Sequence, residues 1–191
     1  MKSSVSYCAK IAVLSAAAAV VMLLELPVAF YRLDLSEVFV LLGGFSMGPL
    51  AAACIELIKN LLNLLLNGTI TGGVGELANF LMGCAFTVPA ALLYRRHKSR
   101  RNAILGCLLG AGCLVAAAVP LNLFVLIPAY CAAFHMETAD IVRMGAALIP
   151  AVDSIGRLIL FITVPFNIVK ALLSSLITVM VYKKLSPILH K

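Results

Sequence analysis

The chain has 191 residues, of which 63% are hydrophobic and only 12% are charged, and its formal net charge is +7. Soluble domains have about half of their residues apolar and about a quarter charged, and a small one buries only ~70% of its unfolded surface. The composition therefore excludes an ordinary soluble enzyme, a disordered segment and a disulfide scaffold. It indicates an integral membrane protein of one domain (residues 1–191), with room for about six crossings.

Apolar runs alternate with polar or glycine-rich links along the chain. They predict six helices, at about residues 9–30, 37–46, 49–66, 74–95, 103–128 and 156–184. The first run is too long for the apolar core of a signal peptide, and the second is too short to cross a bilayer on its own. Gly48-Pro49 separates the second helix from the third, and Pro120 and Pro128 are expected to kink or end the fifth. The predicted fold class is thus an all-α integral membrane bundle.

The charges at the helix ends predict the orientation in the membrane. With six crossings, one side of the membrane holds ten Lys and Arg residues and no acid, and five of these cations lie in the link at residues 95–101. The other side holds three Arg residues and five acids. The positive-inside rule makes the first side cytoplasmic, so both termini are expected in the cytoplasm. Because the basic link has no interleaved aromatic residues, nucleic-acid binding is not expected.

Polar residues within the apolar runs are costly in lipid and are the first candidates for a functional site. Glu56 and Lys59 lie three residues apart on one helix, so we interpret them as an ion pair. For Asn60 and Asn63 a role in joining helices and a functional role both stay open.

Three further polar residues suggest a ligand site. Asn167 and Lys170 share a face of the last helix, and Pro165 disturbs that helix just before them. Lys170 has no acid in its own helix, so it needs a distant carboxylate, a backbone carbonyl or a ligand. Asn122 follows Pro120 in the fifth helix. Two carboxamides and an ammonium group suit a neutral ligand with alternating donors and acceptors, and a structural network between helices is the alternative.

Patterns typical of other functions have simpler explanations. Residues 44–48 fit the G-x-S-x-G nucleophile elbow, but Ser46 is expected on the cytoplasmic side with no carboxylate nearby, so a helix break is favoured. Gly106 and Gly110 predict close helix packing. The six cysteines form no C-x-x-C pair, the three histidines do not cluster, and there is no P-loop sequence, so no metal, cofactor or nucleotide hydrolysis is expected.

Four stretches of the sequence, at residues 33–66, 71–86, 120–130 and 164–189, carry a family resemblance that covers nearly the whole chain. The most specific motifs are GELANF at 75–80 and N-x-x-K at 167–170. With them the chain resembles the riboflavin-specific substrate-binding (S) components, the RibU type, of energy-coupling factor (ECF) transporters.

The resemblance implies a protein of the bacterial plasma membrane that is not an enzyme. Such a protein binds riboflavin, its transported ligand, from the extracellular side. It delivers the vitamin inward together with a transmembrane coupling subunit and two ATPase subunits.

The resemblance also implies roles for individual residues. The expected ligand contacts are Asn122, Asn167 and Lys170 on the polar edge of the flavin ring, Leu35, Val38, Phe39 and Val40 in a link that closes over it, and Glu76 and Asn79 of the GELANF motif. Ala12 and Ala16 of the first helix are expected to dock the coupling subunit. Since the chain has no Trp, stacking on the ring is left to aliphatic residues or to aromatic ones, of which the candidates are Tyr31, Phe39, Phe80, Phe124 and Tyr130.

Three alternatives stay open. The chain is an S-component for another small vitamin or precursor, a small intramembrane enzyme acting through Ser46, or a structural membrane protein whose polar residues only join helices.

Overall fold

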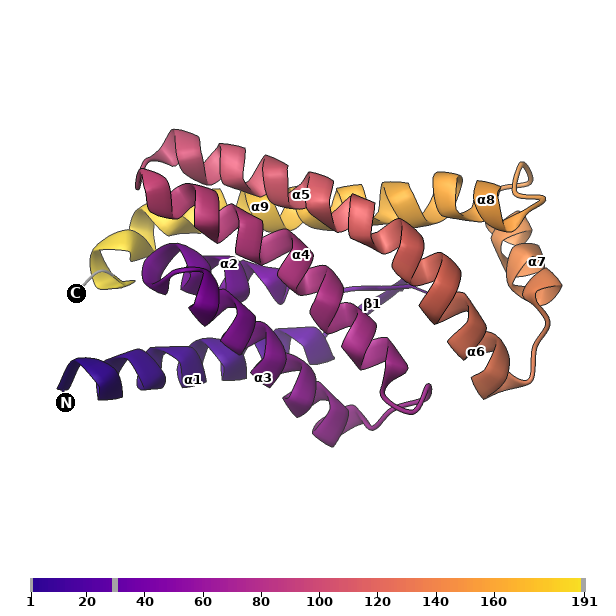
Figure 1. Cartoon of the computed structure of the whole chain (residues 1–191), viewed down its shortest axis with the longest axis horizontal. Coiled ribbons are helices and arrows are strands. Elements are labelled where there is room, and N and C mark those ends of the chain that lie inside the picture. The colour runs from indigo at the N-terminus through magenta and orange to yellow at the C-terminus, as the bar shows by residue number, and fades with distance from the viewer. Residues whose placement is uncertain (1, 29–30, 190–191) are drawn as a thin grey trace.

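The computed structural model describes residues 2–28 and 31–189, and it consists almost entirely of helices (Figure 1). In chain order the elements are α1 (Lys2–Leu23), β1 (Leu26–Val28), β2 (Tyr31–Leu33), α2 (Glu37–Met47), α3 (Pro49–Asn67), α4 (Val74–Arg96), α5 (Arg100–Leu121), the π-helical turn η1 (Asn122–Leu126), α6 (Ile127–Phe134), α7 (Thr138–Leu148), α8 (Ile155–Leu158), the π-helical turn η2 (Ile159–Thr163) and α9 (Val164–Leu189). α5, η1 and α6 form one continuous helix, and so do α8, η2 and α9 (Figure 1).

Within the described residues, five helices are long and apolar enough to cross a membrane. They are α1, α3, α4, α5 with η1 and α6, and α8 with η2 and α9. α2 is apolar but has only 11 residues. Large apolar side chains such as Leu50, Leu65 and Phe124 are exposed on the outside of the bundle, as expected for surfaces that face lipid. These findings confirm a multi-pass, helical membrane protein.

The end of the first helix differs from the sequence prediction. α1 ends at Leu23, whereas the apolar run predicted a helix to residue 30; residues 29 and 30 lie outside the described part of the chain. β1 and β2 pair in antiparallel fashion, with Leu26 opposite Leu33. The physical reason is Pro27, because a helix usually ends at or before the residue that precedes a proline.

The fifth and last helices continue through their prolines. Of the two outcomes predicted for the fifth helix, an end is therefore not observed, whereas the helix does bend between α5 and α6 (Figure 1). η1 ends directly before Ile127-Pro128, and η2 ends directly before Val164-Pro165. In each turn the hydrogen bond spans five residues, from the amide of Ile127 to Asn122 and from Val164 to Ile159. Each π-helical turn thus adjusts the helix just before a proline, which extends the fifth helix beyond the predicted residue 128 to Phe134.

The most extensive helix packing among the described residues is between α4 and α5, where two glycines let the backbones approach. A Cβ atom added to Gly106 would lie 2.7 Å from the carbonyl oxygen of Ala90, and one added to Gly110 would overlap the carbonyl oxygen of Phe86. The predicted close packing through Gly106 and Gly110 is confirmed.

The two ends of the bundle differ in what they carry. The start of α1, the end of α9 and the basic link between α4 and α5 gather at one end (Figure 1). The β1–β2 hairpin, the link between α3 and α4, and α7 lie at the opposite end (Figure 1). α7 lies within a stretch for which the sequence predicted no helix. Its N-terminus is held by a reciprocal capping box between Glu137 and Asp140.

A candidate ligand-binding cavity

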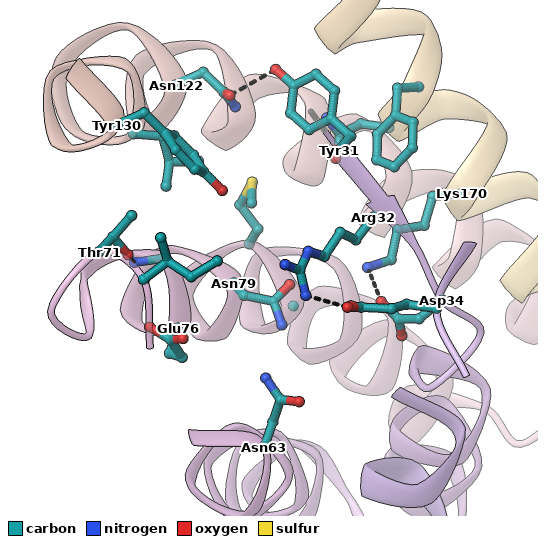
Figure 2. A pocket seen from close by; sticks show the side chains of 18 of the residues that line it. Tyr31, Arg32, Asp34, Asn63, Thr71, Glu76, Asn79, Asn122, Tyr130 and Lys170 are labelled. Atoms are coloured by element: carbon teal, nitrogen blue, oxygen red, sulfur yellow. Dashed lines mark hydrogen bonds and ion pairs between the residues drawn. The ribbon is translucent and has the colours of Figure 1, made fainter. Parts of the chain in front are cut away.

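A cavity of about 600 Å³ lies between α3, α4, η1, α6, α9 and the strand β2 (Figure 2). This volume falls within the range of about 300–1,000 Å³ that is typical of small-molecule sites. The walls combine apolar side chains with polar groups from helices far apart in the sequence. The cavity is therefore the candidate site.

Five of the nine predicted ligand contacts line this one cavity. They are Asn122 of η1, Asn167 and Lys170 of α9, and Glu76 and Asn79 of α4. Their separation in sequence is large, so the fold, rather than local spacing, brings them together.

The four predicted contacts of the link region are not part of the cavity wall. Val38 and Val40 are buried in the protein, while Leu35 and Phe39 are half-buried. The wall near this link is formed by other residues, including Tyr31, Arg32, Asp34 and Glu37. A ligand contact of these four apolar residues stays a prediction.

Two asparagines of the site are tied back to their own helices. The side-chain amide of Asn122 donates to the carbonyl of Ala118 at 2.8 Å, and that of Asn167 donates to the carbonyl of Thr163 at 2.8 Å. These bonds fix which atom of each carboxamide is turned away from its helix. The side-chain oxygen of Asn167 accepts no hydrogen bond from the described residues, so it is available as an acceptor.

Tyr31 of the hairpin lies over this polar pair. Its hydroxyl donates to the side-chain oxygen of Asn122 at 2.8 Å (Figure 2). The same hydroxyl lies 2.5 Å from the hydroxyl of Thr163. Burial raises the pKa of Tyr31 to about 12, and the hydrogen bond with Thr163 opposes this shift. At neutral pH the phenol therefore keeps its proton and acts as a donor.

Lys170 finds its partner in the link before α2. Its ammonium lies 2.9 Å from Asp34 Oδ2 (Figure 2). It also lies 4.0 Å from Glu37 Oε1. Of the three partners left open by the sequence, the distant carboxylate is the one observed. Burial alone would raise the pKa of Asp34, but the charges of Lys170 and Lys59 and the hydrogen bonds from Ser36 and Lys170 hold it well below its usual range.

A second buried ion cluster adjoins the first. Lys59 of α3 lies 2.7 Å from Glu56 Oε1 and 3.0 Å from Glu37 Oε1. The predicted Glu56–Lys59 pair is thus confirmed, whereas the contact with Glu37 was not foreseen. Together, Asp34, Glu37, Glu56, Lys59 and Lys170 form what we call the buried ionic network.

The asparagines of α3 play two different parts. The side-chain amide of Asn60 donates to Glu56 Oε1 at 2.9 Å, and its oxygen accepts from Asn79 of α4 at 2.8 Å. Asn60 therefore joins two helices, one of the two roles that the sequence left open. Asn63, one turn further along, lines the cavity.

Aromatic side chains form two stacked pairs in the wall. Tyr31 and Phe166 stack with ring centroids 4.8 Å apart, and Tyr130 and Phe134 stack at 6.0 Å. Of the predicted aromatic candidates, Tyr31 and Tyr130 line the cavity. The other three do not, and Phe124 is 72% exposed on the outer face.

The outer part of the cavity carries further charges. Arg32 of β2 forms an ion pair with Glu25, and Glu76 accepts a hydrogen bond from Thr69 at 3.0 Å. Sequence reasoning missed Arg32, Asp34, Glu37 and Phe166 as parts of the site. The sequence pointed to the two acids only indirectly, because Lys170 has no acid in its own helix and a distant carboxylate was one of its expected partners.

The other candidate features carry no catalytic or metal site in the described residues. The hydroxyl of Ser46 donates to the carbonyl of Gly43 at 3.1 Å, and the small pocket beside it holds the cations Arg95 and Lys98. No group of three metal-ligating side chains occurs within residues 2–28 and 31–189. On α1, Ala12 and Ala16 are exposed.

Comparisons with known proteins bear on the whole chain. The family described as "ECF transporter, substrate-specific component" matches residues 6–182. The riboflavin transporter RibU of Staphylococcus aureus is 32% identical, over 95% of this chain and 90% of its own length. The riboflavin transporter FmnP of Bacillus subtilis is 28% identical, over 93% of this chain and 90% of its own length.

A solved structure has the same fold. It is described as "Structure and mechanism of the S component of a bacterial ECF transporter", and it matches with a TM-score of 0.75 and 29% identity. The match covers 98% of this chain and 99% of the other.

Proposed function

Since the chain belongs to the substrate-specific components of ECF transporters, we propose that its cavity binds riboflavin from the extracellular side for delivery inward. As the substrate-binding subunit of such a transporter, the chain is no enzyme, and the reading of Ser46 as a nucleophile is not favoured.

The observation that carries the proposal is the convergence of Asn122, Asn167 and Lys170 on one cavity with aromatic walls. The polar edge of the flavin ring carries an imide, in which an N–H donor lies between two carbonyl acceptors. The fixed oxygen of Asn167 supplies an acceptor for such an N–H. Lys170 has three donors, of which Asp34 uses one. The stacked pairs Tyr31–Phe166 and Tyr130–Phe134 supply flat apolar surface for the rings.

The charges of the wall support an uncharged vitamin rather than its phosphate ester. Four acidic side chains line the cavity, against two cations, Arg32 and Lys170. Both cations are already paired with a carboxylate. A phosphate group would therefore meet an excess of negative charge, and we expect flavin mononucleotide to bind more weakly than riboflavin.

We further propose six crossings, with both termini in the cytoplasm of a bacterium. α2 is too short to span alone, but the link at residues 34–36 leads from the hairpin end of the bundle into it, and α3 returns. The clustering of both chain ends with the basic link at one end of the bundle supports this arrangement (Figure 1). The other end then opens the cavity to the outside.

Transport then requires an energy source that this sequence lacks. We propose a transmembrane coupling subunit and two ATPase subunits as partners. The exposed, small side chains of Ala12 and Ala16 on α1 allow another helix to approach closely, which supports α1 as the docking helix.

The direct test is quenching of flavin fluorescence by the purified protein. Asn167→Leu removes the acceptor, and because one neutral hydrogen bond contributes about 0.5–1.5 kcal/mol, we expect Kd to rise about two- to tenfold. Asn102→Leu, at the start of α5 in the basic end, is the matched control and should bind as the unmodified protein does. Absence of quenching at micromolar protein would refute riboflavin as the ligand and favour another small vitamin.

A further inference from the structure

The buried ionic network contains more negative than positive groups. Its members are three carboxylates, of Asp34, Glu37 and Glu56, and two ammonium groups, of Lys59 and Lys170, and none of the five is more than 9% exposed. Each lysine binds at least one of these carboxylates. An uncompensated charge inside a membrane bundle is costly, so one carboxylate remains to be balanced.

Two buried carboxylate oxygens without a hydrogen-bond partner in the described part of the chain show where this excess negative charge lies. Glu37 and Glu56 each present Oε1 to Lys59, at 3.0 and 2.7 Å. Within the described residues, Oε2 of each glutamate is buried and has no hydrogen-bond partner. Because both carboxyl groups contact the same ammonium group, that of Lys59, they lie next to each other. Two ionised carboxylates are acceptors only and cannot bond to each other, whereas one protonated carboxyl can donate to a carboxylate.

We infer that the carboxyl groups of Glu37 and Glu56 share one proton, so that the subunit carries a resident proton beside its cavity. A single proton lets one carboxyl group donate to the other and makes the buried ionic network neutral. Glu37 itself lines the cavity, as does Gly83, whose backbone packs against the Glu56 carboxyl. The inference rests on charge and geometry and does not depend on which ligand the cavity takes.

In the part of the chain that the structure describes, no neighbouring element supplies a different neutralising group. α3 contributes Lys59 and Asn60, whose amide donates to Glu56 Oε1 and leaves Oε2 open. α4 contributes the thiol of Cys84, which is not a cation. α9 contributes Lys170, which lies 4.0 Å from Glu37 and closer to Asp34. Among the described residues, no Arg or His pairs with the network.

Infrared spectroscopy of the protein purified without ligand tests the inference. The sample is prepared with glutamate carrying ¹³C in its side-chain carboxyl, in a detergent without ester carbonyls, at about pH 8, where exposed carboxyl groups are ionised. We expect one C=O stretching band of a protonated carboxyl, and the isotope should shift it, which assigns the band to Glu.

Two substitutions then locate the proton. Glu56→Gln and Glu37→Gln should each abolish the band, because the amide replaces the protonated partner and the remaining carboxylate is ionised. Glu137→Gln, at the exposed start of α7, is the control and should retain the band.

Two results would overturn the inference. One is the absence of an isotope-sensitive band in the unmodified protein, a measurement that needs no variant to fold. The other is a band that survives in both Gln variants, which would place the proton elsewhere. Failure of riboflavin binding would leave this measurement unaffected, so the two proposals are tested separately.

Discussion

Replacing Lys170 by Met removes the cation opposite Asp34 while keeping most of the side-chain volume. The Lys170 ammonium lies 2.9 Å from Asp34 Oδ2, and the Asp34 side chain is 5% exposed. Breaking a buried pair from one side costs about 3–5 kcal/mol, because the other charge stays buried without compensation. We therefore predict a large loss of stability.

A second estimate gives a similar value. Asp34 can avoid a buried, unpaired charge by taking up a proton. At pH 7 this costs about 1.4 kcal/mol for each unit between the pH and the ordinary Asp pKa near 4, or about 4 kcal/mol. For a chain of this length 1 kcal/mol corresponds to about 2–4 °C in Tm, so Lys170→Met should lower Tm by about 6–20 °C.

The double variant Asp34→Asn/Lys170→Met is the decisive comparison. It removes both charges, and replacing a whole buried pair by neutral groups is often close to neutral in stability. The double variant should therefore melt at a higher temperature than Lys170→Met alone. Lys98→Met, which removes an exposed cation of the basic link, is the matched control and should leave Tm unchanged.

A thiol-reactive dye can follow the melting, because the chain has no Trp but six cysteines, all of them free. Cys107 is 3% exposed and becomes reactive only when the bundle opens. Our reasoning is wrong if Lys170→Met melts within about 2 °C of the unmodified protein, a change of about 1 kcal/mol or less. It is equally wrong if the double variant is no more stable than the single one.

Three further predictions use the same melting assay. Gly110→Ala drives a methyl group into a backbone carbonyl of α4 and should cost about 1–3 kcal/mol; Gly112→Ala, with no atom within 4 Å of the new methyl, should keep or raise Tm, and equal effects would contradict the close packing of α4 and α5. Tyr31→Phe keeps the stacked ring but removes the hydroxyl that bonds to both Asn122 and Thr163. It should therefore cost about 1–3 kcal/mol, and an unchanged Tm would show that these two bonds contribute nothing. Folding lowers the pKa of Asp34. The contribution of Asp34 to stability is therefore complete above its ordinary pKa and is lost as the pH falls through the folded-state value. Tm of Asp34→Asn should depend less on pH in the acid range than Tm of the unmodified protein, and parallel acid profiles of the two proteins would refute this.

The sequence predicted those features that depend on short-range patterns. Long apolar runs locate the helices, since each needs about 20 residues to cross the hydrocarbon core. The spacing of Glu56 and Lys59 gave their ion pair, because residues three apart meet on one helix face. The close approach at Gly106 and Gly110 was likewise readable from the sequence.

Features that depend on contacts between residues far apart in the chain could not be predicted from the sequence. Lys170 and Asp34 are 136 residues apart, so no periodicity links them. The β1–β2 hairpin and α7 are short elements stabilised by their surroundings, and the apolar run that continues past Leu23 concealed where the first helix ends. The segment at residues 34–40 illustrates the difficulty. The resemblance implied ligand contacts for its apolar residues, whereas its acids Asp34 and Glu37 are the ones that line the cavity.

The asparagines show what a sequence can and cannot say about a site. Polarity in an apolar run, together with nearby prolines, singled out Asn122 and Asn167, and both line the cavity. Residue type alone gives each carboxamide two donors and one acceptor, and so leaves open which of them a ligand meets. The bonds to Ala118 and Thr163 turn both NH₂ groups back onto their helices, which leaves the oxygens outward. Since the oxygen of Asn122 already accepts from Tyr31, the site offers an open acceptor from Asn167 and donors from Lys170. This polarity follows from the backbone carbonyls beside each asparagine, and it favours a ligand edge that has an N–H beside a carbonyl.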